Sequence, residues 1–149
     1  MQMNELYQDL ILDHGRKPRH QGEMADATHV MDGDNPLCGD QLTIYLRVAN
    51  DTIEKASFVG EGCAISMAAT SLMMEFALGK RVDQFKRVYH TFHQQLTGEA
   101  LTEEQQAELG KLQAFAGVAQ YPLRVKCATL CWHTADAALH GACGSVSTE

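Results

Sequence analysis

The sequence predicts an α+β fold in which a small antiparallel three-stranded sheet is covered on one face by helices. Two observations predict it. Apolar residues alternate with polar ones over residues 42–48, and a second extended run returns at 53–59, which indicates adjacent antiparallel strands. From residue 64 onward, apolar residues recur every three or four positions, which is the spacing of helices. Strands followed by a run of helices are typical of a domain with its helices on one side of the sheet.

The first third of the chain is predicted to begin with a helix and to continue into the sheet. Apolar residues follow a helical stripe over residues 3–11, and Gly15 is placed to end that helix. A polar loop then leads to a first strand near residues 29–31. The turn at residues 34–36 precedes the alternating strand, and the Asn-Asp pair at 50–51 turns the chain into the next strand.

Helices are predicted to fill the rest of the chain, at residues 64–76, 82–96, 102–115 and 122–140. Thr102 and Gln105 have the spacing of a capping box, which marks the start of the third of these helices. Gly117 is expected to break that helix. Pro122 suits the first turn of the last helix, because proline lacks the N–H that this position leaves unbonded.

The length of 149 residues predicts one domain, which we expect to span residues 1–143 and to be followed by a flexible tail at 144–149. A chain of this size buries roughly 70% of the surface that its unfolded form exposes. It therefore needs no disulfide bonds to fold.

The charge balance excludes some classes of function. There are 19 acidic and 12 basic residues, which give a net charge of −7 and argue against nucleic-acid binding, because phosphate binding depends on Lys and Arg. No apolar stretch approaches the roughly 20 residues of a membrane-spanning helix. The first ten residues lack the basic and apolar regions of an export signal, so we expect a cytoplasmic protein.

Three of the five cysteines lie where a predicted element begins. Cys38 and Asp40 share the turn before the alternating strand, Cys63 directly precedes a helix, and Cys127 lies near the start of the last helix. The start of a helix favours the thiolate form of cysteine, which is the form that binds metal or attacks sulfur. If the loops converge, three thiolates and one carboxylate match tetrahedral zinc, and soft sulfur ligands also suit iron–sulfur chemistry.

The residues by themselves leave two interpretations open, a shared metal site or cysteines that merely pack in the core. No CxxC pair is present, and distant loops must meet to form the site. Cys131 lies four residues after Cys127, so it is either a further ligand or sulfur carrier, or a small packing residue. A protein with a structural zinc and an interaction role is a further alternative, in which Cys38 would be an unreactive ligand.

Three segments resemble the signature motifs of NifU-like and IscU-like iron–sulfur cluster assembly proteins, in the same order. They are Asn-Pro-Leu-Cys-Gly-Asp at 35–40, Gly-Glu-Gly-Cys-Ala-Ile-Ser at 60–66 and Arg-Val-Lys-Cys-Ala-Thr-Leu at 124–130. The resemblance extends from about Leu6 to about Leu139. IscU-type scaffolds have a histidine where this chain has Lys126, and the interval between the second and third cysteines is long. Both features resemble the SufU branch of the family.

The resemblance implies a SufE/NifU-like fold and a zinc site of Cys38, Asp40, Cys63 and Cys127, with iron or an iron–sulfur cluster as the alternative. It implies that the protein accepts sulfur from a PLP-dependent cysteine desulfurase, with Cys38 as the persulfide acceptor. The alternative is a scaffold that builds a cluster and passes it to other assembly or acceptor proteins. We also expect Arg124 to pair with Asp40 when that carboxylate leaves the metal. On this interpretation the protein assists a desulfurase and is not an enzyme by itself.

Overall fold

The computed structural model describes residues 3–141 and 145–147. Its elements, in chain order, are α1 (Met3–Arg16), β1 (His29–Asn35), β2 (Asp40–Ala49), β3 (Thr52–Glu61), α2 (Ala64–Ala77), α3 (Val82–Leu96), α4 (Glu103–Leu109), the 3-10 helix η1 (Gly110–Gln120), α5 (Pro122–Leu139) and β4 (Ser145–Ser147). Among these described elements, no helix combines the length and apolar character needed to cross a bilayer.

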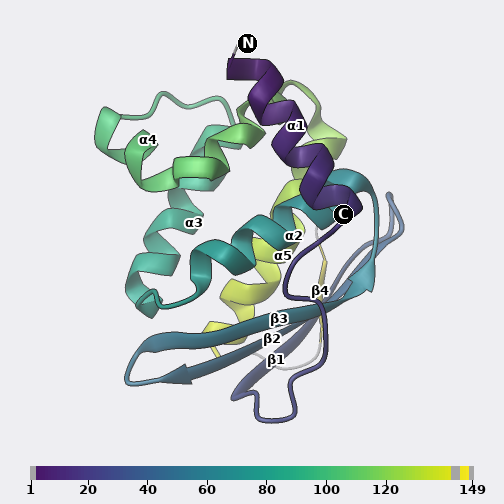
Figure 1. The fold of residues 1–149 in the computed structure, drawn as a ribbon, viewed down its shortest axis with the longest axis vertical. Coiled ribbons are helices and arrows are strands. Elements are labelled where there is room, and N and C mark those ends of the chain that lie inside the picture. Colours follow the sequence, from purple (N-terminus) through teal and green to yellow (C-terminus); the bar gives the residue numbers. More distant parts are fainter. Residues whose placement is uncertain (1–2, 142–144, 148–149) are drawn as a thin grey trace.

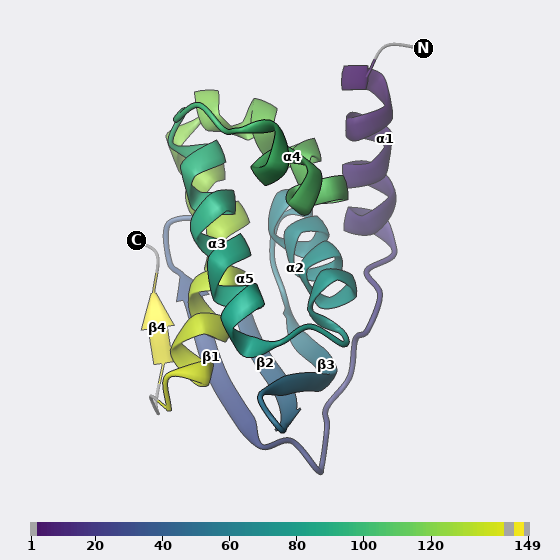
Figure 2. The same cartoon turned by 90° about the vertical axis from the view of Figure 1, so that its left-hand side faces the viewer.

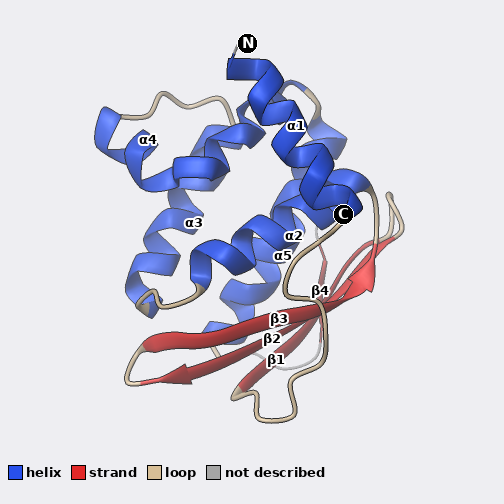
Figure 3. Ribbon diagram, viewed as in Figure 1, coloured by secondary structure: helices blue, strands red, loops and turns tan. Residues whose placement is uncertain are grey.

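The sheet and the helices form two layers, as the sequence predicts. Strands β1, β2 and β3 pair antiparallel in consecutive order, which confirms the predicted three-stranded sheet. The helices are stacked on one face of this sheet, and α2 and α5 lie next to it (Figures 1 and 3). The view turned by 90° shows the same separation of layers, with α1 along the outer side of α2 (Figure 2).

A fourth strand extends the sheet beyond the prediction. Residues 145–147, expected to belong to a flexible tail, form β4 and pair parallel with residues 32–34 of β1. The physical reason is that β1 would otherwise leave a row of backbone N–H and C=O groups unpaired at the edge of the sheet. The predicted domain boundary at residue 143 and the remaining tail residues 144, 148 and 149 lie outside the described residues.

The core lies between the sheet and the helices. The alternation in β2 turns Leu42, Ile44 and Leu46 inward, where all three are buried. Trp132 of α5 is fully buried, and its ring lies beside four other aromatic rings, those of Phe76, Phe85, Tyr89 and Phe92. The last helix is thereby fixed against α2 and α3.

The third predicted helix is shorter than expected. The capping box of Thr102 and Gln105 is present, but α4 ends at Leu109 because Gly110 adopts a φ of 53°. The predicted break at Gly117 is therefore wrong. The chain continues as η1, whose tighter turn repeats every three residues and so buries an apolar side chain at every third position, Leu112, Phe115 and Val118.

The outer edge of β3 is covered by other parts of the chain. Phe58 N donates to His20 O, and Phe58 O accepts from Gly22 N. Farther along the strand, Ile53 exchanges backbone hydrogen bonds with Gly79 and Lys80. The two flanking strands of the antiparallel three, β1 and β3, are thus hydrogen-bonded on their outward sides over part of their length.

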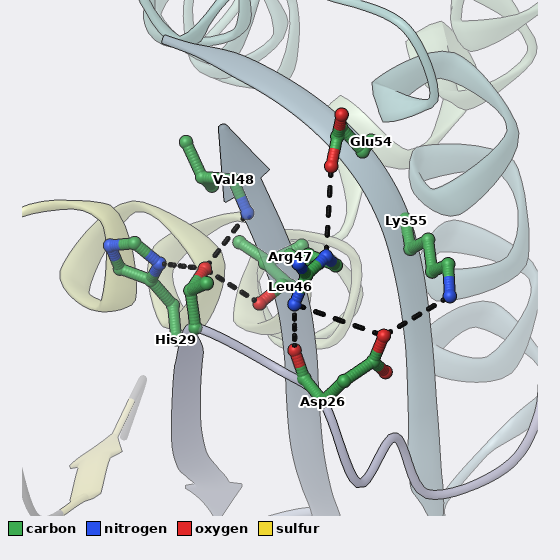
Figure 4. A network of polar contacts seen from close by, with 8 residues as sticks. Asp26, His29, Leu46, Arg47, Val48, Glu54 and Lys55 are labelled. Atoms are coloured by element: carbon green, nitrogen blue, oxygen red, sulfur yellow. Dashed lines mark hydrogen bonds and ion pairs between the residues drawn. The ribbon is translucent and has the colours of Figure 1, made fainter. Parts of the chain in front are cut away.

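An ion-pair network ties the loop before β1 to the uncovered face of the sheet (Figure 4). Arg47 Nη1 donates to the backbone oxygen of Asp26 over 2.7 Å, and Lys55 Nζ lies 3.2 Å from the Asp26 carboxylate. The hydrogen bond from Lys55 lowers the pKa of Asp26, and Arg47 also contacts Glu54. These groups are exposed, so the network serves to place the loop more than to stabilise the fold.

Candidate metal centre

The turn that carries Cys38 is built around Asn35, the last residue of β1. The backbone oxygen of Asn35 accepts from Cys38 N over 3.1 Å and from Gly39 N over 2.9 Å, while its side-chain Oδ1 accepts from Leu37 N over 3.3 Å. Gly39 has a φ of 74°, a conformation that glycine adopts without strain. The turn leaves Cys38 half-buried and Leu37 62% exposed.

Cys63 is the N-cap residue of α2. Its Sγ accepts a hydrogen bond from Ser66 N over 3.4 Å, in the way that a serine or aspartate side chain usually caps a helix. Cys63 is half-buried and therefore remains close to solvent.

Cys127 lies in the first turns of α5 and is only 3% exposed. Its Sγ lies 3.0 Å from Cys38 Sγ, and the side-chain amide of Asn35 donates to it over 3.9 Å. Burial is the main cause that raises the pKa of Cys127, and the nearby Cys38 and Cys63 raise it further. A bound cation reverses this effect, because a thiol that coordinates a metal is deprotonated.

Asp40 begins β2 and is fully buried. Its Oδ1 accepts from Cys63 N over 2.8 Å, and its Oδ2 lies 3.8 Å from Cys63 Sγ. Gly62 passes so close that a Cβ at this position would lie 2.5 Å from Oδ1. Buried carboxylates in proteins are generally paired or coordinate a metal.

The structure brings these groups together at one end of the sheet. The two sulfurs of Cys38 and Cys127 and a carboxylate oxygen of Asp40 all lie within 4.8 Å of one another. Cys63 is not part of this group of three, although its sulfur is next to Asp40. Tetrahedral zinc with Zn–S bonds of about 2.3 Å separates its ligand atoms by about 3.8 Å. The donor types match zinc, but the two sulfurs at 3.0 Å would have to separate and Cys63 would have to approach for all four groups to bind one ion.

Two further residues from the sequence analysis lie apart from this centre. Cys131 is fully buried, burial raises its pKa to about 12, and its Sγ donates to Ala128 O over 3.8 Å, which favours the packing interpretation. Arg124 is exposed and lies over the ring of Tyr121, 4.4 Å from its centroid. The pairing of Arg124 with Asp40 after release of the metal stays a prediction.

Asn35 is the residue that sequence reasoning missed. The sequence places Asn35 in a turn and in the first motif without giving it a role, yet its side chain is fully buried and contacts both the Cys38 turn and Cys127. The signal in the sequence is an asparagine at the end of a strand and directly before proline. Local sequence does not reveal the long-range contact that this asparagine makes.

Replacing Gly62 by alanine is expected to weaken zinc binding by about tenfold or more while the fold is kept. The new methyl group would displace the Asp40 carboxylate, and loss of ligand orientation typically costs 10- to 100-fold in metal affinity. Competition with a chromophoric chelator measures the affinity. Gly117→Ala is the matched control, because a Cβ at residue 117 would meet nothing within 4 Å. Equal affinity of the two variants would contradict the prediction.

Comparison with known proteins identifies the family of this chain. The family model of the NifU-like N terminal domain matches residues 6–128. The zinc-dependent sulfurtransferase SufU of Bacillus subtilis is 36% identical over 130 residues, which cover 87% of this chain and 86% of that protein. The iron–sulfur cluster assembly scaffold protein IscU of Streptococcus pyogenes serotype M1 is 34% identical over 137 residues, which cover 92% of this chain and 84% of that protein.

Solved structures show the same similarity in three dimensions. FiSufU of the thermophile Fervidobacterium islandicum AW-1, described as a candidate iron–sulfur cluster assembly scaffold protein for the SUF system, superposes with a TM-score of 0.83 at 33% identity, over 93% of this chain and 99% of that chain. A NifU-like N-terminal protein of Brucella abortus shares the fold, with a TM-score of 0.77 at 18% identity. The chain therefore belongs to the NifU-like N-terminal domain family of iron–sulfur cluster assembly proteins.

Proposed function

We propose that the protein is a zinc-dependent sulfur acceptor that works with a PLP-dependent cysteine desulfurase of the SUF type in the cytoplasm. The observation that carries this proposal is the unequal burial of two sulfurs in contact. Cys127 is buried in α5, whereas Cys38 lies 3.0 Å from it on an exposed turn. One sulfur is thus within reach of a partner while its neighbours hold the centre together.

The transfer is a thiolate exchange without net oxidation. The Cys38 thiolate attacks the terminal sulfur of a persulfide on the desulfurase, the bond between Cys38 Sγ and that sulfur forms, and the sulfur–sulfur bond of the desulfurase breaks. The desulfurase cysteine leaves as a thiolate, and the proton stays on the transferred sulfur. The outcome is a persulfide on Cys38.

The remaining residues of the centre orient the acceptor. Asp40, Cys63 and Cys127 are the groups that would hold zinc together with Cys38, and zinc would keep the thiols deprotonated at neutral pH. Asp40 would be the hard oxygen ligand in a set of soft sulfurs, so it would be the ligand that zinc holds least tightly. The hydrogen bond from Cys63 N keeps the Asp40 carboxylate in place.

Features outside the centre support the SufU branch. Lys126 stands before the third cysteine, at the position where the family resemblance gives IscU-type scaffolds a histidine. The long segment between Cys63 and Cys127 contains α4 and η1. The similarity to the zinc-dependent sulfurtransferase SufU extends over most of the chain.

A scaffold function is the second candidate. It is favoured by relatives of similar identity that are named cluster assembly scaffold proteins, and by three cysteines at one centre, which is a ligand set for an iron–sulfur cluster. In that case the cluster is the cargo and leaves for acceptor proteins.

Metal and acid-labile sulfide in anaerobically purified protein separate the two functions. We expect about one zinc per chain without sulfide, and loss of zinc in Cys63→Ala, because removal of one of four ligands opens the site. Iron with matching sulfide would establish the scaffold function instead. Zinc that stays at full content in Cys63→Ala would remove Cys63 from the ligand set.

A further inference from the structure

The side chain of Asn35 joins two parts of the metal centre that are far apart in the sequence. Its Oδ1 accepts from Leu37 N within the Cys38 turn, and its Nδ2 donates to Cys127 Sγ, 92 positions along the chain. The residue is fully buried, so both ends of its amide need partners inside the protein. The two bonds fix which end of the amide faces α5.

The Nδ2 group of Asn35 donates its hydrogen bond to the buried sulfur of Cys127. A hydrogen bond from N–H to a thiolate withdraws electron density from the sulfur, which lowers its reactivity and fixes its orientation toward a metal. The buried side chain of Asn35 donates to Cys127 Sγ over 3.9 Å and would supply this bond to the thiolate of a metal-bound Cys127. Cys38 lies on the turn that the other end of the same amide supports.

We propose that Asn35 is a positioning residue that determines which sulfur of the centre exchanges. Its N–H group holds Cys127 in place, so that Cys127 stays bound to the metal. Its carbonyl oxygen supports the turn from which Cys38 leaves the metal and reacts. This inference rests on the metal centre of the proposed function. It adds a residue outside the ligand set and assigns it control over the choice between two adjacent thiols.

Two substitutions isolate the N–H group. Asn35→Asp keeps the shape and the oxygen that accepts from Leu37 N but has no N–H toward Cys127. Asn35→Ser also keeps an oxygen suited to a turn, adds no charge and is too short to reach α5. An effect that is common to both variants is therefore due to the missing N–H and not to the new charge of the aspartate.

The experiment uses the full chain loaded with Co²⁺ or Zn²⁺. Absorption of the Co²⁺ form reports sulfur-to-metal charge transfer, and limiting iodoacetamide followed by peptide mass spectrometry reports which cysteine reacts first. In the unmodified protein we expect Cys38 to be alkylated before Cys127. In both variants we expect the charge-transfer bands to move to lower energy, metal affinity to fall by about tenfold or more, and Cys127 alkylation to rise relative to Cys38.

The outcomes are distinguishable. Unchanged bands and an unchanged order of alkylation in both variants would overturn the inference, as would a change confined to Asn35→Asp, which would be an effect of charge. Failure of the unmodified protein to bind Co²⁺ or Zn²⁺ through its cysteines would instead overturn the proposed function on which the inference rests. Far-UV circular dichroism of each variant verifies that the metal is added to folded protein.

Discussion

Replacing Cys38 by serine is expected to lower persulfide acceptance by more than about a hundredfold, because removal of a nucleophile costs far more than removal of a supporting group. Serine has nearly the same shape, but its hydroxyl is not ionised at neutral pH and is a poor nucleophile toward sulfur. The measurement combines the protein with a cysteine desulfurase and cysteine, then counts the chains that have gained one sulfur atom by intact mass spectrometry.

Cys131→Ala is the control for this loss. Cys131 is a fully buried thiol of α5, the helix that also carries Cys127, and its sulfur donates a hydrogen bond to the backbone of that helix. We expect the alanine variant to accept sulfur as the unmodified protein does. Full acceptance by Cys38→Ser would move the acceptor role to another cysteine of the centre, and Cys63 would be the first to test because it is also half-buried.

Replacing Trp132 by alanine is expected to lower the free energy of unfolding by about 3–5 kcal/mol. The indole is fully buried, and its ring centroid lies 5.0 Å from that of Phe85 and 5.2 Å from that of Phe92. A domain of this kind has a total stability of about 5–15 kcal/mol, so the substitution removes a large share of it. Urea denaturation followed by circular dichroism measures the change.

Trp132→Phe is the matched substitution, because it keeps an aromatic ring among the neighbouring rings and leaves a smaller cavity. We expect it to lose clearly less stability than the alanine variant. A loss below about 1 kcal/mol in Trp132→Ala would show that α5 is held by other contacts.

The sheet was predictable because its signal is local. In β2 the inward residues Leu42, Ile44 and Leu46 alternate with polar ones, and one period of two residues determines both the strand and its buried face. The end of α4 was not predictable in the same way. Gly110 and Gly117 both qualify as helix breakers, and the choice between them depends on how η1 packs against α1, α3 and α5.

The sequence predicts which donor groups converge, and the structure brings Cys38, Asp40 and Cys127 together, whereas the four-ligand metal site itself stays a prediction. Cys38 lies in the turn before β2, Cys63 caps α2 and Cys127 lies in the first turns of α5, and the motifs around them identify them as a set. Their convergence follows from the sheet order, which places the β1–β2 turn beside the start of α2. The contact from Asn35 to Cys127 spans 92 positions and carries no local pattern, so it becomes visible only in three dimensions.

The covered edges of the sheet have a consequence for how this protein meets other chains. An exposed strand edge is a template on which a second chain can add a strand, and such addition leads to domain swapping or aggregation. Here β4 occupies the outward side of β1 at residues 32–34, and β3 is covered at Ile53 and Phe58. Over these stretches strand addition is blocked by the chain itself. A partner that approaches these stretches has side chains to recognise instead, and at the end of the sheet these include the exposed Leu37 beside Cys38.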